Sequence, residues 1–126
     1  MKVNDLEREL VQKLLEDPSL KPTRKTVQWN AINIKSRVMS GVGFLTEFEP
    51  SSELKLFGDE ASLRWGEVGA RLNAARIETG YLVYVDGGHI TAVEGYTYSG
   101  EEWPGRVDAI EWYELKEGME LENPPQ

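Results

Sequence analysis

The stretch from Gly80 to Tyr98 constrains the fold more than any other part of the chain. Two segments rich in β-branched and aromatic residues flank Asp86-Gly87-Gly88, and such residues favour a pleated, half-buried strand. Asp-Gly and Gly-Gly pairs readily adopt the positive φ angles of tight turns that match the twist of paired strands. The stretch therefore predicts a β-hairpin whose register is set by this turn.

An amphipathic helix is predicted near the N-terminus, over about residues 5–16. Apolar residues recur at helical spacing and form one stripe: Leu6, Leu10 and Leu14, widened by Val3, Val11 and Leu15. We expect the polar residues to face away from the core: Glu7, Arg8, Glu9, Gln12 and Lys13. Asn4 or Asp5 can cap the first turn, and Pro18 ends the helix. The mixed charge of the polar face favours packing on a core over binding at a membrane surface.

The strands of the predicted sheet follow, within residues 27–115. The clearest alternation places Val42, Phe44, Thr46 and Phe48 on one face. Weaker alternation over 27–38 predicts an earlier strand, 54–57 a short edge strand and 107–115 a last strand. Residues 61–78 fit either a helix or strands, and we favour strands because Gly66 and Gly69 would each weaken a helix by about 1 kcal/mol.

These elements predict an α+β fold, with a single antiparallel, curved sheet of about five or six strands and the N-terminal helix packed on one face. Several connections are short turns, which only antiparallel neighbours tolerate. The length of 126 residues fits one domain spanning 1–126, ending in a polar tail at 116–126.

Charge is unevenly distributed along the chain. The net charge is −8, and residues 94–126 hold two Lys or Arg against nine Asp or Glu, a net of −7. Such a segment repels nucleic acid and attracts a basic protein partner, although acidity also serves solubility alone. No apolar run is long enough to span a membrane and no signal core follows Met1, so we expect a cytoplasmic protein.

Catalytic signatures are missing from the sequence. His89 is the only histidine and there is no cysteine, so we expect no metal, no cofactor and no catalytic residue. A carboxylate pair for glycoside chemistry stays open, since Glu94, Glu101, Glu102 and Asp108 lie in or near one loop region.

The sharpest constellation combines acidic and aromatic side chains in the C-terminal third. The candidate binding residues are Glu94, Tyr96, Tyr98, Glu101, Glu102 and Trp103. A glutamate beside aromatic rings can hold an arginine or lysine of a partner. The alternative is that Trp103 is a plug on the sheet while Glu94 pairs with Arg106 or with an arginine of 64–76. Arg64, Arg71 and Arg76 could form a basic patch, but we favour arginines that are solvated or paired with the acidic tail.

Four segments resemble a group of small, uncharacterised bacterial proteins: Ser40–Phe48, Gly80–Val85, Glu94–Tyr98 and Trp103-Pro104. These are similar in size and charge to immunity proteins of polymorphic toxin and contact-dependent inhibition systems. The resemblance implies a non-catalytic protein that binds a cognate toxin, and it assigns no functional residue.

We therefore expect a non-enzymatic interaction protein, in the form of an immunity protein that binds a basic toxin domain. The alternative is a small enzyme or small-ligand-binding protein with a pocket between helix and sheet. A homodimer formed through an open sheet edge is compatible with either function.

Overall fold

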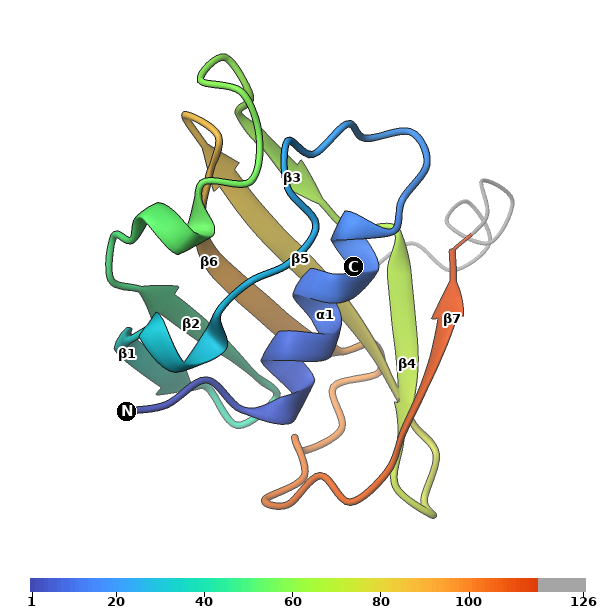
Figure 1. Ribbon diagram of the computed structural model, residues 1–126. Helices are drawn as coiled ribbons and strands as arrows, with labels where there is room; N and C mark the ends of the chain where they lie inside the picture. The colour runs from blue at the N-terminus through green and yellow to red at the C-terminus, as the bar shows by residue number, and fades with distance from the viewer. Residues whose placement is uncertain (116–126) are drawn as a thin grey trace.

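The computed structural model describes residues 1–115, in which one α-helix crosses one face of a seven-stranded antiparallel sheet (Figure 1). The helix is α1 (Asp5–Leu15), and the strands are β1 (Ile34–Met39), β2 (Gly43–Phe48), β3 (Leu63–Trp65), β4 (Val68–Leu72), β5 (Ile77–Asp86), β6 (His89–Thr97) and β7 (Ile110–Glu114). Two short 3-10 helices, η1 (Trp29–Ala31) and η2 (Ser52–Leu54), lie in the connections. The predicted α+β class is confirmed, with more strands than the five or six expected. The predicted polar tail lies outside the described residues.

The β5–β6 hairpin forms the centre of the sheet, as its sequence predicts. Pairing runs from Thr79 opposite Thr97 to Asp86 opposite His89, and the two turn residues Gly87 and Gly88 have φ angles of 57° and 81°. The strand order is β1-β2-β6-β5-β4-β7, and β3 pairs with the half of β5 that β4 leaves uncovered. Every other strand therefore joins the sheet through this hairpin.

The core lies between α1 and the sheet. Leu10, Val11 and Leu14 are fully buried, and the side chains of Val83 and Val93 are fully buried in the same apolar cluster. Burial of an aliphatic side chain of this size contributes about 1.5–3 kcal/mol, so this interface is a main source of stability. The helix begins with a capping box in which Asn4 and Glu7 bond reciprocally to each other's backbone N–H groups.

Glu7 corrects the prediction that it faces away from the core. Its carboxylate is fully buried, and it accepts hydrogen bonds from Asn4 N (2.9 Å), Arg37 Nε and Nη2 (2.9 and 2.6 Å) and Thr46 Oγ1 (2.5 Å). A buried carboxylate is tolerated only when charge and hydrogen bonds compensate it, and here β1 and β2 supply both. Helical periodicity alone therefore predicted the wrong environment for Glu7.

The predicted edge strand at residues 54–57 is wrong. Ser52–Leu54 forms η2, and the chain then bends over the hairpin tip, where the Gly88 carbonyl accepts from the N–H groups of Leu56 (3.0 Å) and Phe57 (3.1 Å). A β-carbon at Gly88 would lie 2.4 Å from the Phe57 carbonyl oxygen, so the close approach depends on this glycine. Lys55 makes a single antiparallel β-bridge to His89, while the apolar residues of the segment cover the hairpin tip and form no strand.

Residues 61–78 form strands β3 and β4, which confirms the strand interpretation. Two of the three arginines in this region pair with the acidic C-terminal segment. Glu111 lies 3.6 Å from Arg71 and 3.1 Å from Arg76, and Arg71 also bonds Glu78 at 2.6 Å. Arg71 and Arg76 therefore pair with carboxylates, as the favoured interpretation expects, and do not form a basic patch.

The face of the sheet opposite α1 carries tyrosine rings over paired glycines. Gly69 on β4 lies directly opposite Gly80 on β5. A β-carbon at Gly69 would lie 2.7 Å from the Tyr113 ring, and one at Gly80 would lie 2.8 Å from the Tyr96 ring. Each ring therefore occupies the space that a side chain on the neighbouring strand would need.

In residues 1–115, no helix combines the length and apolar character needed to cross a membrane.

We expect Glu7→Gln to lower the free energy of unfolding by about 2–3 kcal/mol in urea denaturation, because it leaves Arg37 without its buried counter-charge. The double variant Glu7→Gln/Arg37→Met should recover part of that loss, since no charge then stays unpaired. Glu102→Gln, which removes an exposed carboxylate, should change stability by less than about 0.5 kcal/mol. A similarly small effect for Glu7→Gln would contradict the stabilising role of the pair.

Candidate functional site

The six predicted binding residues do not form one site. Glu94 and Tyr96 lie on β6, on the face opposite α1, and Tyr98 follows the strand. Glu101 and Glu102 are exposed in the loop that leads toward β7. The ring of Trp103 lies on the helix side of the sheet, in the hydrophobic core. The structure therefore brings together at most Glu94, Tyr96 and Tyr98.

Trp103 is the plug that the alternative interpretation describes. Its side chain is buried, with its ring edge-on to Phe44 (centroids 5.2 Å apart) and to Tyr81 (6.4 Å). Its backbone N–H donates to the Gly41 carbonyl at 2.7 Å. The buried ring thus anchors the 99–109 loop to the core.

Glu94 bonds to a tyrosine, while Arg106 pairs with Asp108 at 2.7 Å. The Tyr84 hydroxyl donates to Glu94 Oε1 at 2.7 Å, and this bond, more than partial burial, raises the pKa of Tyr84. Tyr96 and Tyr98 pack edge to face, with ring centroids 5.7 Å apart. This group is a half-buried, hydrogen-bonded patch on the face of the sheet opposite α1.

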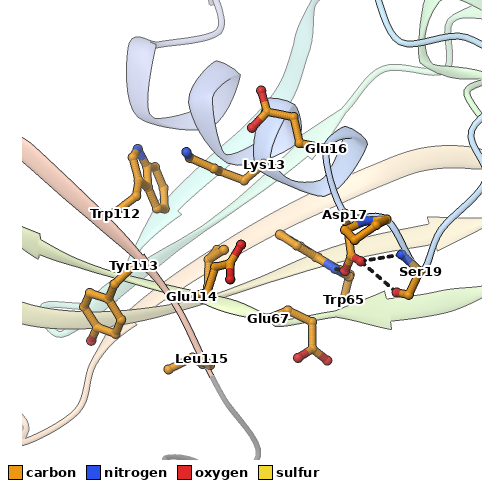
Figure 2. Close-up of a pocket in the computed structure, with 12 residues that line it drawn as sticks. Lys13, Glu16, Asp17, Ser19, Trp65, Glu67, Trp112, Tyr113, Glu114 and Leu115 are labelled. Atoms are coloured by element: carbon orange, nitrogen blue, oxygen red, sulfur yellow. Dashed lines mark hydrogen bonds between the residues drawn. The ribbon is translucent and has the colours of Figure 1, made fainter.

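A cleft of about 570 Å³ opens between the C-terminal end of α1, the β3–β4 connection and β7 (Figure 2). We refer to it as the α1–β7 cleft. Its lining is acidic and aromatic, and consists of Lys13, Glu16, Asp17, Pro18, Ser19, Trp65, Glu67, Val68, Trp112, Tyr113, Glu114 and Leu115. Four carboxylates face one amine in this set, which gives the lining a formal charge of −3.

Asp17 is the most firmly held carboxylate of the cleft. Trp65 Nε1 donates to Asp17 Oδ2 at 2.7 Å, and Ser19 donates its N–H (2.8 Å) and its hydroxyl (2.7 Å) to Oδ1 (Figure 2). The indole hydrogen bond is the main reason that the pKa of Asp17 lies below its ordinary value of 3.8. Since Pro18 stops the helix here, the turn presents a fixed, ionised carboxylate at the mouth of the cleft.

Two indole rings form the apolar walls. Trp65 is buried, and Trp112 is half-buried with its Nε1 donating to Glu9 Oε1 of α1 at 2.8 Å. Alternation along β7 turns Tyr113 to the other side of the sheet, where its hydroxyl donates to Glu78 at 2.6 Å (Figure 2). The side chains of Asp17 and Glu114 point into the cleft, whereas Glu67 of the β3–β4 connection lines its rim with the carboxylate turned away (Figure 2). Both glutamates are exposed.

The chemistry of this arrangement is recognition of positive charge. Carboxylates beside indole faces suit a guanidinium or an ammonium group, which gains hydrogen bonds and cation–π contacts together. His89 lies at the hairpin tip, where its ring contacts the Gly87 carbonyl, and it does not line this cleft. Within the described part of the chain, no group of His, Cys, Asp or Glu side chains is arranged to hold a metal ion.

The sequence did not identify the residues of this cleft, although the alternative function placed a pocket between helix and sheet. Glu114 belongs to the acidic C-terminal segment but was not a candidate residue, and Asp17 and Trp65 are 48 positions apart and belong to no motif. Comparison with known proteins found no matching family model, no similar curated protein and no similar solved structure. Function is therefore inferred from the residues of the cleft.

We expect Trp65→Phe to raise the pKa of Asp17 toward 3.8, because the variant removes the indole donor to its carboxylate. Carboxyl-carbon NMR titration would measure the change. A lowered pKa in the folded state stabilises the protein above the unfolded-state value, and this stabilisation is lost as the pH falls through the folded-state value. Trp112→Phe, which removes the other indole donor, should leave Asp17 unchanged, and an equal shift there would contradict the assignment.

Proposed function

We propose that this chain is a cytoplasmic, non-catalytic interaction protein whose α1–β7 cleft binds a cationic side chain of a basic protein partner. The observation that carries the proposal is the lining of the cleft, which contains four acidic side chains and two indole rings but one lysine. Such a lining opposes anionic ligands and favours cations. The site lies partly on β7, in the acidic C-terminal third of the sequence.

Arginine fits this lining better than lysine does. Its planar guanidinium can stack on an indole face and donate to two carboxylate oxygens at once, whereas an ammonium acts as a point charge. A cation–π contact contributes about 0.5–2 kcal/mol, depending on how far solvent is excluded. Because the Asp17 carboxylate is already fixed by three hydrogen bonds, binding costs little further ordering at that position.

The specific form of the proposal is an immunity protein that binds a basic toxin domain. A chain with a net charge of −8 steers a basic partner toward itself and repels nucleic acid. The exposed carboxylates Glu67 and Glu114 at the cleft would meet the partner first. Association should therefore weaken as salt concentration rises.

A small-ligand-binding protein is the second candidate. The volume of about 570 Å³ lies in the range typical of small-molecule pockets, and the cleft sits between helix and sheet. The same lining would select an organic cation in that case. Turnover screening with Glu94→Gln and His89→Ala as controls addresses the enzymatic version of this alternative.

We expect the double variant Glu67→Gln/Glu114→Gln to bind a cognate basic toxin domain, to be sought among the neighbouring genes, about tenfold more weakly than the wild type, because it removes two cleft carboxylates. Isothermal titration calorimetry at two salt concentrations would measure this. The matched control is Glu101→Gln/Glu102→Gln, which removes the same charge from the loop after β6 and should leave the affinity unchanged.

Other results would contradict the proposal. A greater loss of affinity in the control variant would show that the binding surface lies in the loop after β6. A wild-type chain that neither binds nor neutralises the toxin would refute the immunity role. NMR titration with N-acetylarginine methylamide tests the cleft without the partner, and the Trp65 and Trp112 indole signals should move while N-acetylglutamate leaves them unchanged.

A further inference from the structure

The large hydrophobic side chains that residues 1–115 leave exposed gather at the β1–β2 end of the molecule. Val38, Met39 and Val42 are 59%, 54% and 43% exposed, and Leu45 lies beside Val38 on β2. Met1, also exposed, is tied to this end because its carbonyl accepts from the N–H of Ile34. Neither the core nor the α1–β7 cleft uses Val38, Val42 or Leu45. An apolar patch confined to one edge is typical of an association surface.

β1 is also an edge strand with backbone groups available for pairing. Ser40 N donates to the Gly43 carbonyl, so Ser40 and Gly43 form a hydrogen-bonded pair. Hydrogen-bonded and non-hydrogen-bonded pairs alternate along antiparallel strands, so the N–H and C=O groups of Val38 also point toward β2. The backbone N–H and C=O groups of Arg37 and Met39, which lie between these positions, point away from the sheet. Residues 37–39 can therefore accept a further strand without breaking any bond to β2, while Ile34 keeps its bond to the Met1 carbonyl.

β1 and β7, the two ends of the strand order, differ in the charged side chains that they expose. β7 carries exposed carboxylates at Glu111 and Glu114, and charge on an edge strand discourages pairing. On β1, the Arg37 side chain is turned to the buried Glu7, and residues 38–42 are uncharged. The β1 edge has one exposed charge, Lys35, near its start, so charge opposes strand pairing less at residues 37–39 of β1 than on β7.

We propose that two copies of this chain pair antiparallel through β1, with the two-fold axis at Val38. This register places Arg37 opposite Met39 of the other copy and Lys35 opposite Gly41, so like charges do not meet. An axis at Arg37 would oppose two guanidinium groups, and an axis at Ser36 would oppose Lys35 and Arg37, which is unfavourable in a strand pair. Charge therefore selects the register.

The pairing creates a self-complementary contact. On the face opposite α1, the side chains of Leu45 and Val38 from each copy would form one continuous apolar strip across the axis. A C2 interface requires such self-complementarity. Because β7 lies at the far end of the strand order, both α1–β7 clefts stay open in the dimer.

Cysteine cross-linking tests the register directly, because the chain contains no cysteine. At the proposed axis the two copies of residue 38 form a non-hydrogen-bonded pair with Cα atoms about 4.5 Å apart, within disulfide reach. We expect Val38→Cys to form a covalent dimer under mild oxidation. The matched control is Met39→Cys, an exposed neighbour whose two copies would lie about 8 Å apart, too far for a disulfide.

Sedimentation equilibrium of the wild-type chain should show a dimer whose fraction rises with concentration. Val38→Lys should weaken the dimer at least tenfold, whereas Thr91→Lys, at an exposed position on β6, should not. A wild type that stays monomeric, or equal cross-linking by Val38→Cys and Met39→Cys, would overturn the proposal. If the wild type is monomeric and Val38→Lys instead weakens binding of the basic partner, the β1 edge belongs to that partner and self-pairing is refuted.

Discussion

The position of α1 depends on the carboxylate of Glu7, which is buried and bonded to groups from β1 and β2. Two further carboxylates extend this attachment, since Glu9 accepts from Trp112 on β7 and Asp17 accepts from Trp65 on β3. Apolar burial holds the helix to the sheet but is indifferent to small rotations. The three directional bonds fix its orientation, and the α1–β7 cleft is the space left where the last two attach.

Features of the fold that depend on neighbouring residues were predictable. The β5–β6 hairpin follows from Asp86-Gly87-Gly88, and the two strands in 61–78 follow from the cost of Gly66 and Gly69 in a helix. Features that depend on distant partners were not. Glu7 follows the polar period of the helix, and only Arg37 and Thr46, more than 29 positions away, make its burial acceptable.

The sequence predicted acidic and aromatic residue types for a binding surface, but it did not predict which residues form the cleft. An acidic and aromatic binding surface was expected in the C-terminal third, but Trp103 faces the core there, and the cleft takes Trp112 and Glu114 from β7. Composition indicates which side chains a segment offers, whereas the face on which each one lies depends on strand register. The contributions of Asp17 and Trp65 required the tertiary structure, because no short motif links them.

The tyrosine rings that lie over Gly69 and Gly80 limit how this sequence can vary. A side chain at Gly69 needs the volume that Tyr113 fills, and one at Gly80 needs the volume that Tyr96 fills. A larger residue at either glycine therefore requires the ring opposite to move or to become smaller, and at Gly80 the Tyr98 hydroxyl, also 2.8 Å from the added β-carbon, must move as well. In related sequences these positions should change as pairs, and such covariation would identify members of this fold even where overall identity is low.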